Sequence, residues 1–147
     1  MSNRIDTAMS AIETALKTLV ETNGTGVLKA VERRLINPHL EQNVPVLGLV
    51  PLRADRVGGA GGTWTVTVQL ALCTRGKRDE GGADASEIMA AVQGAINTLA
   101  ATSKTGWQVD LPGWTFWFAN LGDYLVPCGA RGTLRITISG DLLIPPD

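Results

Sequence analysis

The stretch D-R-V-G-G-A-G-G-T, residues 55–63, places four glycines in five positions. Glycine-rich turns hold phosphate groups when they lie between a strand and the N-terminus of a helix, where backbone N–H groups and the helix dipole face the anion. Here the segments on both sides have the character of strands, no lysine-serine or lysine-threonine ending follows, and no GxGxxG spacing opens a helix. The stretch therefore predicts a hairpin loop over residues 53–62, and not a nucleotide site.

The other residues capable of chemistry are few and scattered. His39 is the only histidine, which excludes a site of several imidazoles and leaves one candidate base for a nucleophilic triad. Cys73 and Cys128 lie far apart and outside any CxxC pattern, so we expect two free thiols rather than a disulfide or a metal site. Asp110, Asp123 and Asp141 are the candidates for a carboxylate cluster, but they fall on separate elements, which does not favour a metal or glycosidase site. We predict no catalytic residue, no metal, no cofactor and no enzymatic activity.

Composition indicates a globular protein. The chain has 147 residues, of which 44% are hydrophobic and 18% are charged, and this size suits one domain over residues 1–147. Thirteen basic residues against 14 acidic ones give a formal net charge of −1, which does not favour general nucleic-acid binding. Charged residues interrupt the N-terminal 24 residues, so we do not expect a signal peptide there. No segment approaches the roughly 20 consecutive apolar residues that cross a bilayer. We expect no membrane association and synthesis in a cytoplasm.

Two helices are predicted to position these residues. Residues 5–20 carry apolar side chains at helical spacing, and the sequence N-G-T-G, residues 23–26, predicts the end of that helix. A second helix begins after Asp84, which is the expected N-cap with Glu87 completing a capping box. Its small residues Ala91 and Ala95 would let it lie close to a sheet.

Strands account for most of the remaining chain. Residues 63–74 alternate strictly, with Val66, Val68 and Leu70 on one face. Residues 27–36 and 46–52 are weaker predictions, and Pro45 and Pro51 favour an edge strand for the second of these. The last third of the chain, from Trp107 onward, is again strand-like. The order predicts an α+β fold, in which two main helices pack on a mostly antiparallel sheet.

An aromatic strand is the remaining unusual feature. Trp107, Trp114, Phe116, Trp117 and Phe118 fall within twelve residues, and residues 114–118 carry bulky side chains on both strand faces. One face would be core, and the other must be covered or expose tryptophan to water. Tryptophan is enriched at the centres of protein interfaces, so Trp114, Phe116, Trp117 and Phe118 are candidates for a subunit interface. A core strand covered on both faces is the alternative.

The layout of the chain resembles the tail terminator, or tail-completion, proteins of long-tailed bacteriophages. The resemblance covers most of the chain: the first helix, the proline-marked strand and glycine-rich loop leading into T-W-T-V-T-V-Q-L-A-L-C, the second helix, and the closing strand T-L-R-I-T-I-S-G-D-L-L. In that family a short opening helix precedes a proline-marked strand, a long hairpin loop follows, and a helix packs over the sheet. The aromatic segment of residues 111–127 departs from this pattern.

The resemblance implies a ring, usually of six subunits, at the head-proximal end of the tail tube of a virion. Such a ring stops addition of tube protein and presents a surface to the head-tail connector, while genomic DNA passes through its lumen without specific binding. A closed ring needs a heterologous interface. The loop residues Arg53, Asp55, Arg56, Val57, Gly58, Gly59, Gly61 and Gly62 are then candidates for contact with the tube or a neighbouring subunit.

Two other hypotheses remain open at this stage. The chain could be a head-tail connector, neck or other minor tail protein with a similar small fold, which would contact the portal side rather than the tube. It could also be a small cytoplasmic enzyme that uses Cys73 or His39.

Overall fold

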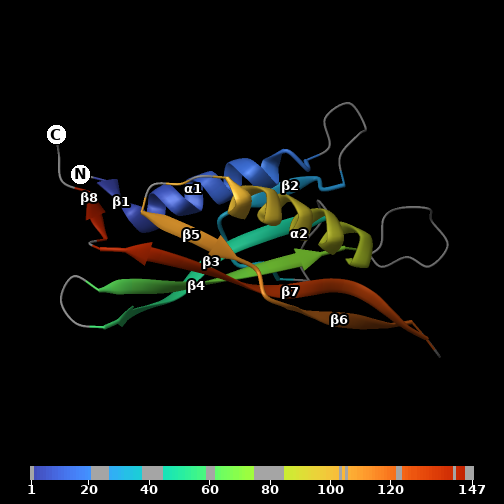
Figure 1. Cartoon of the computed structure of the whole chain (residues 1–147). Coiled ribbons are helices and arrows are strands. Elements are labelled where there is room, and N and C mark those ends of the chain that lie inside the picture. The colour runs from blue at the N-terminus through green and yellow to red at the C-terminus, as the bar shows by residue number, and fades with distance from the viewer. Residues whose placement is uncertain are drawn as a thin grey trace.

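The computed structural model describes residues 2–20, 27–37, 45–58, 62–74, 85–102, 104, 106–121, 124–140 and 142–144; for residues 2, 85, 117–121, 124–128, 143 and 144 it describes the backbone alone. Helices α1 (Arg4–Lys17) and α2 (Ala85–Ala101) lie on one face of a curled six-stranded sheet (Figure 1). This arrangement confirms the predicted α+β fold.

Helix α1 begins at a side-chain cap and ends earlier than predicted. The Asn3 Oδ1 accepts a hydrogen bond of 2.6 Å from the backbone N–H of Asp6, which satisfies one of the unpaired amides of the first turn. The helix buries one stripe, made of Ala8, Met9, Ile12 and Leu16. It stops at Lys17, because the next residues turn and Val20 pairs with Leu28 in an isolated bridge. The predicted stop at residues 23–26 lies outside the described residues.

Helix α2 follows the predicted pattern. Ile88, Val92 and Ile96 are at most 1% exposed and face the core, as expected for positions four residues apart on one helical face. The N-cap predicted at Asp84 lies outside the described part of the chain. At the other end, the Lys104 Nζ donates to the carbonyl oxygens of Leu99 and Ala100 at 2.6 and 3.2 Å, which satisfies two carbonyls of the last turn.

The main sheet contains strands β2 (Ala30–Glu32), β3 (Val46–Val57), β4 (Thr63–Cys73), β7 (Tyr124–Ser139) and β5 (Trp107–Asp110) in that spatial order, and β6 (Trp114–Leu121) also pairs with β7. The β2–β3 pair is parallel, and the other pairs are antiparallel. Strands β1 (Ser2–Asn3) and β8 (Leu143–Ile144) form a separate small antiparallel pair.

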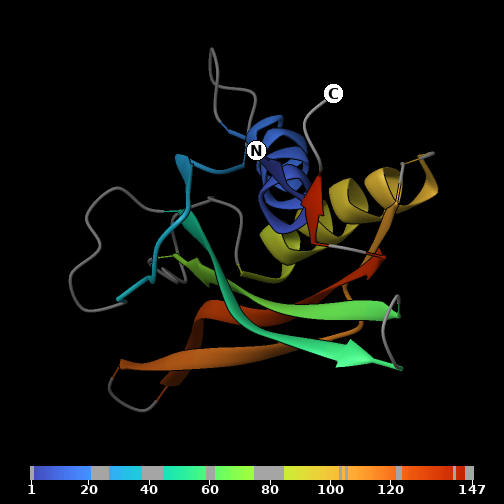
Figure 2. The ribbon, with the colours of Figure 1, turned by 90° about the vertical axis from the view of Figure 1, so that its left-hand side faces the viewer.

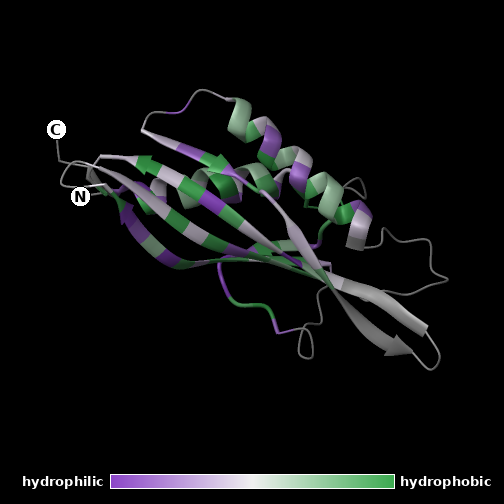
Figure 3. Ribbon diagram, turned by 60° about the horizontal axis from the view of Figure 1, so that its bottom comes forward, coloured by the Kyte–Doolittle hydropathy of each residue, from purple (hydrophilic) through white to green (hydrophobic). Residues whose placement is uncertain are grey.

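Strand alternation decides which side chains reach the helices. Val66, Val68, Leu70 and Leu72 of β4 are at most 1% exposed and lie beside Leu134, Ile136 and Ile138 of β7, which are fully buried. Leu47 and Leu49 of β3 complete this layer. Neither of the two described helices lies over the opposite face of the sheet (Figure 2). The colours in Figure 3 alternate along the strands between hydrophobic and hydrophilic. The alternation predicted for residues 63–74 is therefore confirmed.

Two strand predictions had wrong boundaries. The segment 27–36 forms only the three-residue strand β2. Strand β3 runs on to Val57, five residues beyond the predicted end, because its polar second half pairs in register with β4 from Arg53↔Thr67 to Val57↔Thr63. Backbone pairing with β4 therefore keeps residues 53–57 in the strand conformation, although their own sequence does not show the alternation of a strand.

Candidate assembly surfaces

The uncovered face of the sheet is a polar surface organised by strand register. One row of neighbouring side chains runs across β7, β4 and β3 through Arg135, Thr67 and Arg53. The next row on the same face, two residues further along each strand, consists of Thr137, Thr65 and Asp55. Arg135, Arg53 and Thr133 are exposed, and Thr65, Thr67 and Gln69 are half-buried. Strand β5 extends these two rows with Asp110 beside Arg135 and Gln108 beside Thr137. Hydroxyl and mixed-charge groups therefore cover this face.

The first half of the predicted loop over residues 53–62 is strand, which corrects the assignment of residues 53–57. Arg53, Asp55, Arg56 and Val57 belong to β3, so the connection to β4 spans residues 58–62 alone. Gly58 has φ of +87°, a left-handed conformation that favours glycine. Gly62 is described and its carbonyl accepts a bond from the N–H of Gly140, whereas Gly59 and Gly61 lie outside the described residues.

The charged residues of this hairpin point to both sides of it. Arg53 and Asp55 share the uncovered face, where the Arg53 Nε lies 2.8 Å from Oδ1 and 2.7 Å from Oδ2 of Asp55. Arg56 pairs with Trp64, whose alternation places it on the helix side of the sheet. Arg53 and Arg56 are both exposed. The hairpin therefore presents a cation on each of its faces.

Strand β3 has a partly open outer edge, as Pro45 and Pro51 predict. Strand β2 pairs only with Val46, Leu47 and Gly48, so among the described strands the rest of this edge has no neighbour. Pro51 offers no N–H there, and the register shifts between Pro51 and Arg53. Leu52, at the shift, is 58% exposed, and Val57 is 59% exposed. A proline, an irregularity and charges protect the edge against uncontrolled strand pairing.

The aromatic strand contributes to the core through Trp114 and Phe116. Both are half-buried and pack against the hydrophobic core on the helix side. The Trp114 Nε1 donates to Oε1 of Gln93 on α2 at 3.1 Å, and a Cβ on Gly132 would lie 3.2 Å from its ring. These contacts favour the core alternative for these two residues. The side chains of Trp117 and Phe118 lie outside the described set, so their interface role stays a prediction.

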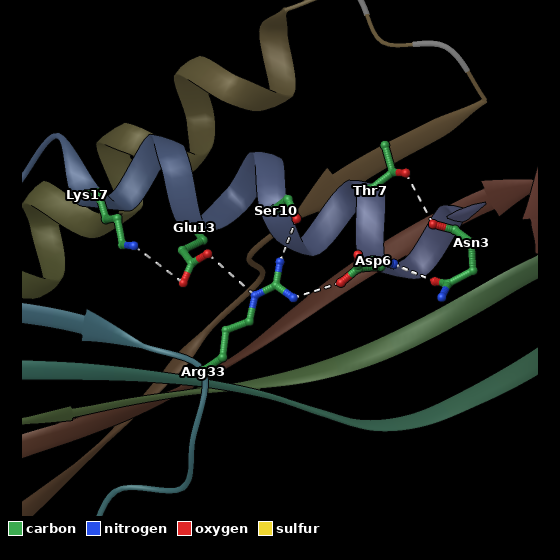
Figure 4. Close-up of polar contacts among 7 residues, drawn as sticks. All are labelled: Asn3, Asp6, Thr7, Ser10, Glu13, Lys17 and Arg33. Atoms are coloured by element: carbon green, nitrogen blue, oxygen red, sulfur yellow. Dashed lines mark hydrogen bonds and ion pairs between the residues drawn. The ribbon is translucent and has the colours of Figure 1, made fainter. Parts of the chain in front are cut away.

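A short segment after β2 crosses from the helix side to the uncovered face. Its first residue, Arg33, binds α1: Nη1 donates to Oδ1 of Asp6 at 2.8 Å, Nη2 donates to Oγ of Ser10 at 2.7 Å, and Nε lies 3.6 Å from Oε1 of Glu13 (Figure 4). Lys17 supports Glu13 from the next turn at 3.7 Å. Three groups on one helix therefore fix the start of this segment, residues 33–37, which we call the crossing segment.

The crossing segment borders a hollow on the uncovered face, which sequence analysis did not predict. The hollow has a volume of about 450 Å³, and its lining includes Arg34, Leu35, Ile36, Val50, Ala71 and Arg131. The signal that could have revealed it is Gly48, a glycine within a strand pattern, which often marks a close backbone approach. A Cβ at Gly48 would lie 2.5 Å from both the backbone oxygen of Arg34 and Cγ1 of Ile36.

The candidate catalytic residues are not brought together by the described parts of the fold. Cys73 is only 4% exposed at the end of β4, and its Sγ lies 4.0 Å from the carbonyl oxygen of Thr74. His39, Asp123, Cys128 and Asp141 lie outside the residues or side chains described. Within the described set, no three histidine, cysteine, aspartate or glutamate residues gather as metal ligands. Neither described helix has the length and apolar character needed to cross a bilayer.

The chain matches no known protein-family profile, and no curated protein of similar sequence is found.

Proposed function

We propose that this protein is a structural component of a long-tailed bacteriophage: a tail terminator whose subunits form a ring, hexameric by the family pattern, on the head-proximal end of the tail tube. The ring would end tube polymerisation and provide the surface for joining to the head. Its partners would be further copies of itself, the tail tube protein and the head-tail connector. Genomic DNA would pass through the lumen without specific binding.

The observation that carries the proposal is the order and placement of the elements. The opening helix α1 is followed by the short strand β2 and then by β3, which carries Pro51 at a partly open edge. The β3–β4 hairpin and a helix over the sheet come next. This is the layout on which the resemblance to tail terminators rests. The hairpin extends from the helix-covered part of the sheet in Figure 1 and presents Arg53 and Arg56 on opposite faces.

The uncovered sheet face supports the same function. A ring that encloses DNA requires a hydrophilic lining, and the rows of threonine, glutamine and mixed charge on β7, β4 and β3 have that character. The apolar residues of the hollow, Leu35, Ile36 and Val50, border these rows on the same face. Arg131, Arg135 and Arg53 are accompanied by Asp55 and Asp110 on the same face. This balance suits passage of DNA better than tight binding, which depends on clustered positive charge.

The test of this function has two stages. Solution mass and electron microscopy of the purified protein over a wide concentration range should reveal closed rings with a central hole. Added to growing tail tubes, about one ring per tube end should stop elongation and cap one end of each tube. Tubes that lengthen at the same rate with and without the protein would exclude the terminator role.

The same experiment separates the alternatives. A protein that ignores tubes but binds isolated connector would be a neck protein. The enzyme alternative has little support from Cys73, because a nucleophile needs access to substrate and this thiol is buried in the isolated chain.

A further inference from the structure

The outer edge of strand β3 has the geometry to accept a further strand near the tip of the β3–β4 hairpin. Strand β2 pairs only with the first three residues of β3, and no other described strand lies along the rest of this edge. On the inner side, β4 pairs with residues 53–57 in an unbroken register. The backbone of this segment is therefore already extended, and an extended edge presents N–H and C=O groups to a partner strand.

Two side chains of opposite charge lie side by side on this edge. The Nε of Arg53 lies 2.8 Å from Oδ1 and 2.7 Å from Oδ2 of Asp55, on the uncovered face of the sheet. The side chains are 73% and 46% exposed, and the Nη groups of Arg53 have no partner among the described residues. A guanidinium carries five N–H donors and a carboxylate accepts several hydrogen bonds. Each group can therefore contact a second opposite charge while it keeps the first.

This pattern of charge fits a second copy of the same strand in one register. Antiparallel pairing that continues the same face places a twofold axis at one residue of each strand. An axis at Arg53, Asp55 or Arg56 puts two identical charges opposite each other, which destabilises a strand pair. An axis at Ala54 instead puts Arg53 of each copy opposite Asp55 of the other. Because each charge also keeps its partner on its own strand, the four groups alternate in sign around a square.

The same register gives the exposed apolar side chains of the hairpin a neighbour. Leu52 is 58% exposed, and it lies opposite Arg56 of the second copy, whose methylene groups can cover it. Val57 is 59% exposed, and it lies opposite Pro51. Since Pro51 has no N–H to donate, the pairing ends at this position.

We infer that the β3 edges of two copies of this protein pair antiparallel about a twofold axis at Ala54, through reciprocal contacts between Arg53 and Asp55. The occupant of the open edge is thus the same strand of a second chain. The inference goes beyond the proposed function, because two hairpins pair without a ring or a tube.

Cysteine cross-linking of the full-length protein tests the register. Ala54→Cys places two thiols opposite each other, where the Cα separation of about 4.5–5.5 Å suits a disulfide. Val57→Cys is the control, because it is exposed on the same strand but the two copies of Val57 lie about 20 Å apart in this register. With diamide as the oxidant, Ala54→Cys should form a two-chain species at least about tenfold faster than Val57→Cys. The wild type gives the background from Cys73 and Cys128.

Charge reversal tests the contact itself. Arg53→Asp and Asp55→Arg each put like charges opposite one another twice, so either change in the Ala54→Cys protein should slow the cross-link at least about fivefold. The double variant Arg53→Asp/Asp55→Arg keeps the net charge and restores both attractive contacts. Its cross-link should form within about twofold of the rate of Ala54→Cys alone. Circular dichroism checks that the variants fold, as expected for two exposed side chains.

Three results would overturn the inference: equal rates for Ala54→Cys and Val57→Cys, a cross-link that neither single reversal slows, or a double variant as slow as the single ones. Ala54→Cys that cross-links to added tail tube protein but not to itself would also overturn it, by assigning the edge to that partner. Because the self cross-link needs no ring and no tube, its failure leaves the terminator proposal unaffected, and failure of tube capping leaves this inference unaffected.

Discussion

Ile36 packs directly on Gly48, so that the crossing segment touches the sheet where the sheet has no side chain. A Cβ at Gly48 would lie 2.5 Å from Cγ1 and 2.9 Å from Cδ1 of Ile36, and 2.5 Å from the backbone oxygen of Arg34. On the other face of the same strand, Leu47 and Leu49 are fully buried under the helices. The sheet is therefore enclosed on both faces at this end, and Gly48 sets how closely the crossing segment approaches.

Gly48→Ala is predicted to destabilise the protein. The added methyl group meets a backbone oxygen as well as a side chain, so relief requires the crossing segment to move, and such overpacking costs about 1–3 kcal/mol. Urea unfolding followed by circular dichroism gives the change in the free energy of unfolding. The NMR signals of residues 34–37 should shift in the folded variant, since they carry the displacement. A variant as stable as the wild type, with unchanged signals, would contradict the close packing.

Gly94→Ala is predicted to have the opposite sign. Gly94 lies inside helix α2 on an exposed face, and a Cβ there meets nothing within 4 Å. Replacing glycine by alanine at such a site stabilises a helix by about 0.5–1 kcal/mol, because the unfolded chain loses conformational freedom. The same urea measurement checks it. The pair of variants adds one methyl each, so only the surroundings of the two glycines account for opposite signs.

Arg33→Met is predicted to lower the free energy of unfolding by about 1 kcal/mol. Methionine keeps the length of the side chain but removes the contacts with Asp6, Ser10 and Glu13 on α1. The side chain of Arg33 is 32% exposed, so screening limits the effect, and part of the loss should disappear in high salt. Arg53→Met is the control, because the side chain of Arg53 is 73% exposed and its described partner, Asp55, lies on its own strand rather than on a helix. Equal losses in both variants would show that the anchoring of α1 adds nothing.

Lys104→Met is predicted to cost about 1–2 kcal/mol, which is a typical range for a charged group that caps carbonyls at the end of a helix. The Lys104 Nζ donates to carbonyl oxygens of Leu99, Ala100 and Thr102, and it lies 5.5 Å from the centroid of the Trp107 ring. Lys17→Met serves as control, since among the described residues its amine contacts a single carboxylate, that of Glu13 at 3.7 Å, and the lysine side chain is 56% exposed. The loss should appear as faster hydrogen exchange in the last turn of α2. Unchanged exchange there would contradict a capping role.

Periodicity alone predicts the elements that carry their own apolar pattern, namely α1, α2 and β4. It fails where long-range pairing decides. Residues 53–57 carry three charged side chains among five, yet they are strand because β4 offers them a complete hydrogen-bonding partner. The uncovered-face hollow was missed for a related reason: it depends on contacts between the crossing segment and Gly48, far apart in sequence. The aromatic strand could be assigned only for Trp114 and Phe116, whose alternation and pairing with Gly132 and Ala130 place them toward the core.

The hairpin charges provide the functional prediction. Arg53→Glu and Arg56→Glu, tested singly, should each reduce capping of tail tubes at least about tenfold while leaving the free energy of unfolding within about 0.5 kcal/mol, because both residues are exposed. Arg135→Glu makes the same charge change two strands further into the sheet and should leave capping unchanged. Replacing residues 58–62 by Asn-Gly should preserve the β3–β4 register, since a two-residue turn closes such a hairpin. The shortened hairpin should cap tubes less well than the wild type, because the proposed contact with the tube includes this connection. Capping is measured from tube lengths by electron microscopy. If the hairpin variants cap tubes as well as Arg135→Glu does, the hairpin is not the surface that contacts the tube.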